Sequence, residues 1–416
     1  MSEIRAIPKN WQIKKLGEVC QIIMGQSPPS TTYNSDKKGL PFFQGKAEFT
    51  ETHPIASKWC SSPNKIAEPN DILLSVRAPV GTTNIANQKC CIGRGLAAIR
   101  YRNYKYVFYF LKCIEQSLDN KGTGTTFKAI SGETIRLTEI PIPPLQEEQA
   151  IVTKIEELLS ELENGKQQLQ TAQQQLKIYR QSLLKWAFEG KLTNKKVKEG
   201  ELPKRWKWVT LGDVCSNVEY GSATKSKKSG KVPVLRMGNI QKGVFDWDDL
   251  VYTDDDEEIK KYLLKKNDVL FNRTNSAEWV GKTAIYKGER PAIFAGYLIR
   301  INRIESLIDA NYLTYFLNTH FAKNYGNTVR SFGVNQSNIN GTKLKTYPIP
   351  LAPIEEQHRV IQELESKLTI CDKIEETISQ SLLQAETLRQ SILKKAFEGI
   401  LVKFDSETSK KKVKKI

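Results

Sequence analysis

The sequence predicts an α+β protein that is a tandem repeat with pseudo-twofold symmetry. Two globular α/β domains are separated by two long helices, and these helices are expected to form an antiparallel intramolecular coiled coil. Two observations support this fold class. The same phrases recur in the same order in both halves of the chain. Each half also ends in a segment whose apolar residues follow heptad spacing.

The repeat is clearest at the two ends of each half. RQSLLKWAFEGKL begins at Arg180, and RQSILKKAFEGIL begins at Arg389. PKNWQIKKLGEVC begins at Pro8, and PKRWKWVTLGDVC begins at Pro203. Between these landmarks, each half carries a PIP triplet that is followed by Glu-Glu-Gln. A unit of this length is a domain with its connecting helix, because solenoid repeats are much shorter.

Composition excludes several classes of protein. The chain has 416 residues, which predicts two to four domains. Its hydrophobic content of 39% is enough to form the cores of these domains. It has no apolar run of membrane-spanning length and no apolar secretion segment at its N-terminus. The seven cysteines form no C-x-x-C pair, and there are only three histidines. We therefore expect a cytoplasmic protein without a membrane-spanning segment or a metal site.

The first part of each half mixes strand and helix signals. Short β-rich runs such as DILLSV, CIGRGLAAIRY, VPVLRM and AIFAGYLIRI lie between Gly, Pro, Asn and Ser turns. One helix is expected in each half, over 104–118 and 309–325. Trp11 and Trp206 occupy the same repeat position and are interpreted as core residues. The globular domains are expected to cover 1–145 and 203–352, with a linker over 191–202.

The second part of each half reads as one long helix, over 146–190 and 353–401. In the first helix, position d is expected to carry small residues at Gly165 and Ala172, which would allow close approach, and aromatic residues at Tyr179 and Trp186. The apolar a positions, Cys371 and Ala385 among them, and the aromatic residue near each helix end form the predicted coiled-coil and partner-binding set: Ile155, Leu162, Leu169, Leu176, Leu183 and Phe188, with Leu364, Ile378, Ile392 and Phe397.

Pairing of the two helices within the chain is simpler than pairing between chains, because the effective concentration is high. An antiparallel pair of about 44 residues would be a rod of roughly 65 Å with a globular domain at each end. Gly190 and Gly399 fit the position just past a helix, where a left-handed residue ends it. The second helix end would return beside the first domain.

Charge points to a polyanionic partner. The net charge is +17, with basic runs in the linker and in the tail over 402–416. Nucleic acid is the first interpretation and a membrane surface the second. Two similar but non-identical domains at a fixed separation suit a DNA target with two different half-sites.

At this point the residues resemble a known family. IMGQSPPSTTYN (23–34), GLPFFQGKAEF (39–49), VPVLRMGNIQKG (232–243), FNRTNSAEWVGKTAIY (271–286) and the two PIP–EEQ–AFEG helices look like the specificity subunit of type I restriction-modification enzymes. The resemblance implies two target-recognition domains, 1–145 and 203–352, and two conserved helical regions. It also implies a cytoplasmic, DNA-associated protein of a bacterium or archaeon.

The same resemblance implies the partners. They are double-stranded DNA, two modification subunits that methylate adenine with S-adenosylmethionine, and restriction subunits that use ATP and Mg. This chain itself would bind no cofactor and catalyse nothing. Its one Gly-Lys-Thr triplet, in SAEWVGKT (276–283), lacks the first glycine of a P-loop and precedes a strand-like run. The alternatives are a self-contained enzyme, which needs a site the sequence does not show, and a coiled-coil DNA-binding adaptor or scaffold outside a restriction system.

DNA contacts are expected from loops. Arg and Lys favour guanine, Asn and Gln favour adenine, and hydroxyl groups favour phosphate. The candidate DNA-binding residues share such a side chain and a position among turn residues: Gln26, Ser27, Gln44, Lys46, Arg77, Lys121, Thr123, Thr125 and Lys128 in the first half, and Arg236, Asn239, Arg273, Asn275, Lys282, Arg330, Asn335 and Gln336 in the second.

Overall fold

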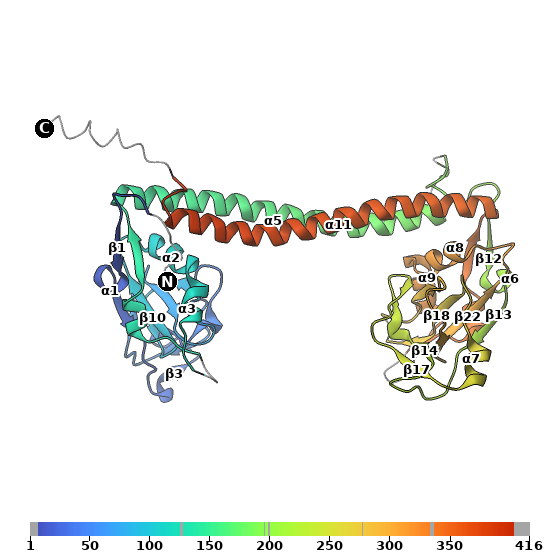
Figure 1. Ribbon diagram of the computed structural model, residues 1–416, viewed down its shortest axis with the longest axis horizontal. Coiled ribbons are helices and arrows are strands. Elements are labelled where there is room, and N and C mark those ends of the chain that lie inside the picture. The colour runs from blue at the N-terminus through green and yellow to red at the C-terminus, as the bar shows by residue number, and fades with distance from the viewer. Residues whose placement is uncertain are drawn as a thin grey trace. The chain divides into compact units, whose positions relative to one another are not determined.

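The computed structural model describes residues 7–124, 128–194, 196–198, 200–276, 278–332 and 337–402. The chain forms two compact units, residues 1–169 with 380–416 and residues 170–379 (Figure 1). The two long helices are α5 (Leu145–Phe188) and α11 (Ile354–Phe397). Each unit therefore contains one globular domain and about half of both long helices. The basic tail, beyond Val402, lies outside the described residues.

The globular domain of the first unit is built on two sheets. The central sheet has the order β2-β10-β7-β8, and a five-stranded sheet has the order β3-β5-β4-β9-β6. The bounds of the central strands are Gln21–Met24, Leu96–Arg100, Ile72–Ser75 and Thr83–Ile85. Those of the second sheet are Tyr33–Asn34, Trp59–Cys60, Leu40–Phe43, Cys90–Ile92 and Ile66–Ala67. The terminal ribbon pairs β1 (Gln12–Lys15) with β11 (Glu139–Ile142).

Alternation along the central strands explains the layers. Ile72 and Leu74 face a core that contains the helix residues Tyr106 and Phe397. Leu73 faces the opposite core, which it shares with residues of the five-stranded sheet. Because successive side chains of a strand point to opposite faces, one strand serves both cores. The central sheet is thus covered by helices on one face and by the second sheet on the other.

The second unit repeats this arrangement. Its central sheet has the order β13-β22-β18-β20, with bounds Cys215–Tyr220, Leu298–Arg303, Val269–Asn272 and Thr283–Ile285. The other face carries β17 (Val251–Thr253), β14 (Val232–Leu235) and β21 (Ile293–Phe294). Smaller pairs join β15 (Ile240–Gln241) to β16 (Val244–Phe245) and β12 (Lys207–Thr210) to β25 (Pro348–Leu351). A three-stranded sheet contains β19 (Thr274–Asn275), β24 (Ser337–Asn338) and β23 (Ser331–Phe332).

Each helix expected within a globular domain is two helices. The first region forms α2 (Tyr104–Cys113) and α3 (Glu115–Asn120), and the second forms α8 (Ala310–Leu317) and α9 (His320–Val329). The second break has a clear cause, because the Thr319 hydroxyl caps α9 by accepting a hydrogen bond from the Ala322 amide. The apolar periodicity continues across both breaks, and for this reason the sequence suggested single helices.

The remaining helices are short. In the first unit they are α1 (Leu16–Val19), α4 (Gly132–Arg136), η1 (Ser30–Thr32) and η2 (Lys46–Glu48). In the second unit they are α6 (Leu211–Val214), α7 (Asp256–Tyr262), α10 (Gly341–Lys345) and η3 (Met237–Asn239).

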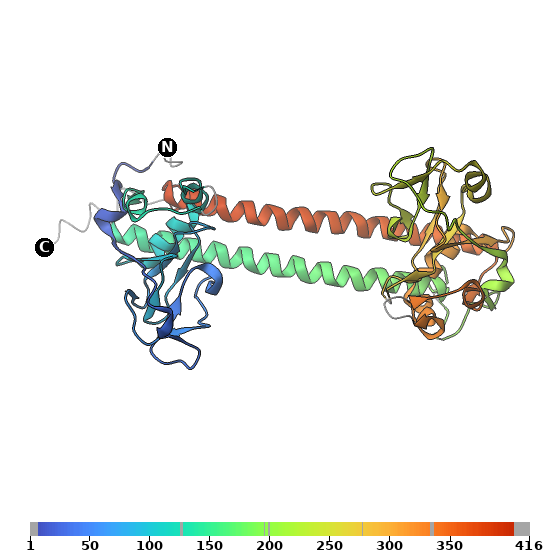
Figure 2. The same cartoon turned by 90° about the horizontal axis from the view of Figure 1, so that it is seen from below.

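Within each unit the two long helices run antiparallel, side by side (Figures 1 and 2). In the first unit, Ile155 of α5 shares a core with Leu393 of α11, and Lys166 Nζ lies 3.9 Å from Glu386 Oε2. In the second unit, Arg180 Nη2 lies 2.6 Å from Asp372 Oδ1. Residue numbers rise along one helix as they fall along the other. The predicted fold class, with antiparallel pairing of the two helices inside the chain, is therefore confirmed.

The predicted heptad is only partly right. The a positions of α11, from Leu364 to Ile392, are buried, and so are Leu176 and Leu183 of α5. The prediction for Tyr179 and Trp186 is wrong, because these residues are 42% and 39% exposed and pack edge to face against each other. A straight helix has 3.6 residues per turn, so a stripe drawn with a period of 3.5 drifts away from the seam.

The expected close approach at Gly165 is also wrong. A Cβ atom built there meets nothing within 4 Å. Gly165 leaves open space beside α5 instead of admitting a neighbouring backbone.

The two AFEG phrases end the long helices as expected. Gly190 has a φ of +72° and Gly399 a φ of +71°. The Gly190 amide donates to Ala187 O at 3.2 Å, and the Lys191 amide donates to Trp186 O at 2.9 Å. This double hydrogen bond is a Schellman motif. Gly190 packs on Pro203 and Gly399 packs on Pro8, so the second helix end does return to the first domain.

Candidate nucleic-acid interface

In the first unit, the end of β7 and the start of β10 lie beside three loops that are joined by hydrogen bonds. The Val76 amide donates to Gly95 O at 2.9 Å, and the Ile130 amide donates to Val76 O at 3.0 Å. The Gly25 amide donates to Leu96 O at 2.9 Å. We call this part of the domain the loop edge: residues 25–27, 44, 76–77, 93–95 and 128–130.

The second unit has the same loop edge. The Arg273 amide donates to Tyr297 O at 3.0 Å, and the Ile339 amide donates to Arg273 O at 2.9 Å. The matching residues are 221–222, 236, 273–275, 295–297 and 337–339. These hydrogen bonds make Arg273 the counterpart of Val76, although the similar phrases NDILLSVR and NDVLFNR both end in arginine. The two edges therefore share a backbone but differ in the side chain at their centre.

Three predicted residues come together on the first loop edge. The Ser27 hydroxyl accepts hydrogen bonds from Gln44 Nε2 at 3.0 Å and from the Arg94 amide at 3.2 Å. Gln26 and Gln44 are exposed. An amide fixed by a hydroxyl and presented to solvent can read a base edge with little loss of side-chain entropy.

Arg94 was missed by the sequence analysis. It is exposed, follows Gly93 in the turn at the centre of the edge, and forms no ion pair within the part of the chain that the structure describes. The signal was present as Arg94 between two glycines in CIGRGLAAI. Because the flanking residues are apolar, the sequence around Arg94 favours a β-rich run.

A second group of predicted residues borders the first loop edge. Arg77 and Thr123 both form β-bridges to Ala129, and the Ala78 amide donates to Lys128 O. Arg77, Lys121 and Thr123 are exposed, whereas the Lys128 ammonium is paired with Asp119. This pairing lowers the pKa of Asp119. Lys46 is exposed in η2, and Thr125 lies outside the described residues.

In the second unit, Arg236 and Asn239 are used by the fold. Arg236 is the counterpart of Gln44, and its Nη2 donates to Asp249 Oδ2 at 3.0 Å. Asn239 is 3% exposed. Its Nδ2 donates to Asp246 O and Asp249 O, and its Oδ1 accepts from the Arg236 amide. In this conformation Asn239 has no free edge for a base, so it organises the η3 turn.

Arg273 and Lys282 are cations held on aromatic rings. The Arg273 guanidinium carbon lies 4.8 Å from the centre of the Tyr220 ring, and Lys282 Nζ lies 4.0 Å from that of Trp279. Burial, with Lys323 nearby, lowers the pKa of Lys282. The Gly-Lys-Thr triplet precedes the strand β20, as expected, and not a helix.

The remaining predicted contacts are less informative. Asn275 lies in β19, and its Oδ1 accepts a hydrogen bond from the adjacent Ser276 amide. Arg330 ends α9. Asn335 and Gln336 lie outside the described residues.

The predicted coiled-coil residues are mostly inside. Ile155, Leu176, Leu183, Leu364, Ile378 and Ile392 are buried, and Leu162 and Leu169 are half-buried. Phe188 packs edge to face on Tyr312 and Phe316, and Phe397 packs in the same way on Tyr106 and Phe110. Each helix end is therefore built into the core of a globular domain.

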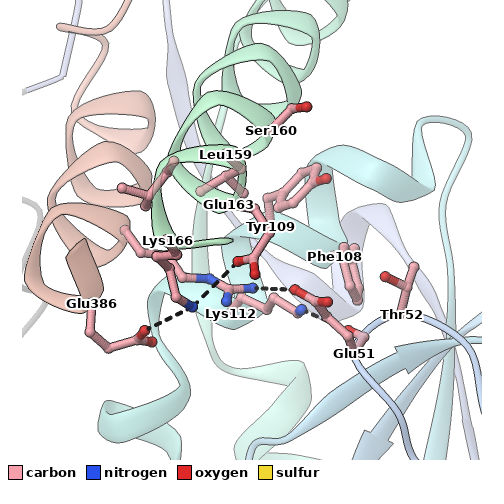
Figure 3. A pocket seen from close by; sticks show the side chains of 12 residues that line it. Glu51, Thr52, Phe108, Tyr109, Lys112, Leu159, Ser160, Glu163, Lys166 and Glu386 are labelled. Atoms are coloured by element: carbon pink, nitrogen blue, oxygen red, sulfur yellow. Dashed lines mark hydrogen bonds and ion pairs between the residues drawn. The ribbon is translucent and has the colours of Figure 1, made fainter. Parts of the chain in front are cut away.

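A polar pocket of about 250 Å³ lies where the first globular domain meets both long helices (Figure 3). Arg389 Nη2 lies 3.5 Å from Glu51 Oε1. Lys166 Nζ lies 3.3 Å from Glu163 Oε2 and 3.9 Å from Glu386 Oε2. Lys112 donates to Glu51 O and covers the Phe108 ring, and burial lowers its pKa. Three basic and three acidic side chains line the pocket, so their formal charges cancel. It suits a structural joint better than an anion site.

Each globular domain carries a loop edge with polar and basic side chains, and each is packed against the ends of the long helices. The family model described as "Type I restriction modification DNA specificity domain" matches residues 8–171 and 203–384. The chain therefore belongs to the family of type I restriction-modification DNA specificity proteins, with one copy of the domain in each half.

Curated relatives agree with this assignment. The specificity subunit of the type I restriction enzyme EcoKI from Escherichia coli is 25% identical over 95% of this chain and 90% of its own length. The putative MjaX specificity subunit from Methanocaldococcus jannaschii is 46% identical, over 37% of this chain and 38% of its own length.

Solved structures show the same fold. One comes from work on complex assembly and conformational transition of the type I R-M system, with a TM-score of 0.73 and 20% identity over 95% of this chain and 100% of that one. The crystal structure of the HsdS subunit from Thermoanaerobacter tengcongensis gives 0.64 and 20% identity over 95% of this chain and 98% of that one. Among the residues that the structure describes, no helix is long and apolar enough to cross a membrane.

Proposed function

We propose that this chain is the DNA sequence-recognition subunit of a type I restriction-modification complex and that it reads an asymmetric bipartite site. The globular domains over 1–145 and 203–352 each bind one half-site. The helical regions over 146–190 and 353–401 hold them together, and the linker 191–202 connects the first helical region to the second domain. The basic tail over 402–416 adds non-specific attraction to phosphate.

The observation that supports this proposal most directly is the pair of matched loop edges. Val76 and Arg273 make equivalent backbone hydrogen bonds but differ completely in side chain. Gln44 and Arg236 differ in the same way. Equal backbone frames that carry different side chains favour two different half-sites, and the net charge of +17 favours DNA as the ligand.

Methyl transfer and cleavage would belong to partner subunits. Two modification subunits would bring S-adenosylmethionine, and restriction subunits would bring ATP and Mg. Exposed apolar residues along the long helices suit their docking: Ile178, Tyr179 and Trp186 of α5, and Ile370, Ile374, Leu383 and Leu388 of α11. Large apolar side chains that are left in water on a helix favour a protein partner.

Reconstitution tests this function. Plasmid DNA is incubated with S-adenosylmethionine and with this chain, its modification subunit, or both. We expect adenine methylation only when both are present. Methylation by this chain alone would support an enzyme instead. DNA binding without any effect on methylation would support an adaptor outside a restriction system.

A further inference from the structure

The centre of the second loop edge holds an arginine that the fold leaves largely unused. Arg273 is half-buried, and its Nε is buried without a hydrogen-bond partner. Its Nη1 donates only to Gly296 O, at the long distance of 3.3 Å. A guanidinium group has five N–H donors, so most of its hydrogen-bonding capacity is left over.

Two other half-buried arginines of this unit, Arg300 and Arg236, are paired with carboxylates, although the Arg236 Nε is also buried without a hydrogen-bond partner. Arg300 Nη2 lies 2.6 Å from Glu219 Oε2, and Arg236 Nη2 lies 3.0 Å from Asp249 Oδ2. No carboxylate pairs with Arg273 among the residues that the structure describes. Burying an unpaired donor costs free energy, so a ligand that accepts from this guanidinium would recover the loss.

The Tyr220 ring holds this arginine in place. The guanidinium lies over the ring, and the Tyr220 hydroxyl accepts a hydrogen bond from the Gly341 amide at 2.7 Å. The hydrogen bond from Gly341 fixes the position of the Tyr220 ring. The cation–π contact with this ring then limits the rotamers that the Arg273 side chain can adopt. The planar donor group is therefore ordered before any ligand binds.

The first unit lacks this pair. Val76 stands in place of Arg273, and the strand register of β2 and β13 places Met24 at the position of Tyr220. Gly296, which receives the Arg273 hydrogen bond, corresponds to Arg94 in the turn of the first loop edge. Both edges therefore bring a guanidinium to the same turn, from different backbone positions.

We propose that Arg273, ordered on the Tyr220 ring, is the base-reading residue of the second recognition domain and binds the major-groove edge of a guanine. This inference rests on the proposed function. A fork of two parallel N–H donors matches the guanine O6 and N7 acceptors, and no other base offers this pair. The second half-site then contains a G·C pair, whereas Arg236, tied to Asp249, contributes to the fold of the edge.

The test uses the complex of the full chain with its modification subunit. Sequencing of methylated positions is compared for the wild type, Arg273→Lys, Arg273→Ala and Arg290→Ala. Arg290 is a matched control, because its guanidinium also lies on a ring, Trp247, in the same unit. Arg273→Lys keeps the charge over Tyr220 but loses the fork. We expect Arg273→Ala to relax one base pair of one half-motif, with discrimination falling about 10-fold to 100-fold, and Arg273→Lys, which can still donate to guanine, to relax it less.

A second arm does not depend on the folding of any variant. Each guanine of the second half-site is replaced by 7-deazaguanine, which lacks the N7 acceptor, and binding of the wild-type complex is measured. We expect one position to weaken binding about 10-fold or more. The same replacement should have little further effect on Arg273→Ala, because the two changes remove one interaction.

Several outcomes overturn the inference. They are a second half-site without a G·C pair, tolerance of 7-deazaguanine at every guanine, an unchanged motif in Arg273→Ala, and an equal change in both half-motifs. If the wild-type complex yields no bipartite motif at all, the proposed function fails. If it yields one that ignores Arg273, this inference alone fails.

Discussion

The Trp206 indole Nε1 donates a hydrogen bond of 2.5 Å to Glu356 Oε2 at the start of α11. Trp11 makes the same contact with Glu147 at the start of α5, at 2.8 Å. Both indole rings are buried, as expected for core residues. The first turn of each long helix is thus tied to the entry of a globular domain by an indole hydrogen bond, and Asn10 Nδ2 also donates to Glu147 Oε1 at 2.8 Å.

Removing this acceptor should destabilise the second unit. Glu356→Ala leaves a buried indole N–H without a partner, at a cost of about 1–3 kcal/mol. Glu355→Ala is the control, because Glu355 is exposed in the same first turn and loses only the dipole contribution. Urea unfolding measures the difference. Equal losses in the two variants would mean that the hydrogen bond contributes nothing beyond the helix dipole.

The glycines that end the helices should not tolerate a side chain. A Cβ atom at Gly190 would lie 2.3 Å from Pro203 Cγ, and one at Gly399 would lie 2.4 Å from Pro8 Cδ, both at positive φ. Gly190→Ala and Gly399→Ala should each cost roughly 2–4 kcal/mol in the free energy of unfolding.

Gly165→Ala supplies the opposite control. It lies inside α5 with open space around it, so alanine should stabilise the protein by about 0.5–1 kcal/mol. Thermal unfolding of the three variants checks both signs. Stabilisation by Gly190→Ala would contradict the packing of the helix end on Pro203.

Alkaline pH should weaken the fold through tyrosines that are partly buried. Burial raises the pKa of Tyr109 and of Tyr315 to about 12. In the unfolded chain these phenols ionise near their ordinary pKa of about 10. Stability is therefore fully present below about pH 10 and falls as the pH rises toward 12. Tyrosinate absorbance should show a slow or late class of tyrosines, and ionisation of all fifteen near pH 10 in the folded protein would refute this.

The helical frame should set the gap between the half-sites. Deleting residues 167–173 and 379–385 removes one heptad from each helix, between the pairs Lys166–Glu386 and Arg180–Asp372. This shortens each helix by about 10 Å, the rise of about three base pairs. Sequencing of the methylated motif should give a different gap with the same half-motifs. An unchanged gap would mean that the recognition domains set the spacing independently.

Local signals predicted the frame well. α5 and α11 each have 44 residues, and their ends match repeated phrases in the sequence. The left-handed glycines could be predicted because their role depends on neighbours in the chain. Tyr179 and Trp186 could not be placed, because their exposure depends on how the helix turns against its partner.

The candidate interface was predicted only in outline. Gln26, Ser27 and Gln44 do meet on one loop edge. Asn239 has the right chemistry but is consumed by hydrogen bonds to Asp246 and Asp249. The central position of Arg273 follows from backbone hydrogen bonds to Tyr297 and Ile339, residues distant in sequence. Such pairings are set by the tertiary fold and are not readable from composition or spacing.

The most direct test of the account is the DNA motif itself. The chain is co-expressed with its modification subunit in a host that lacks other adenine methylation, and methylated positions are sequenced across the genome. We predict one asymmetric motif of two unlike half-sites separated by an unread gap. A continuous motif, or a palindrome with identical halves, would contradict recognition by two different domains.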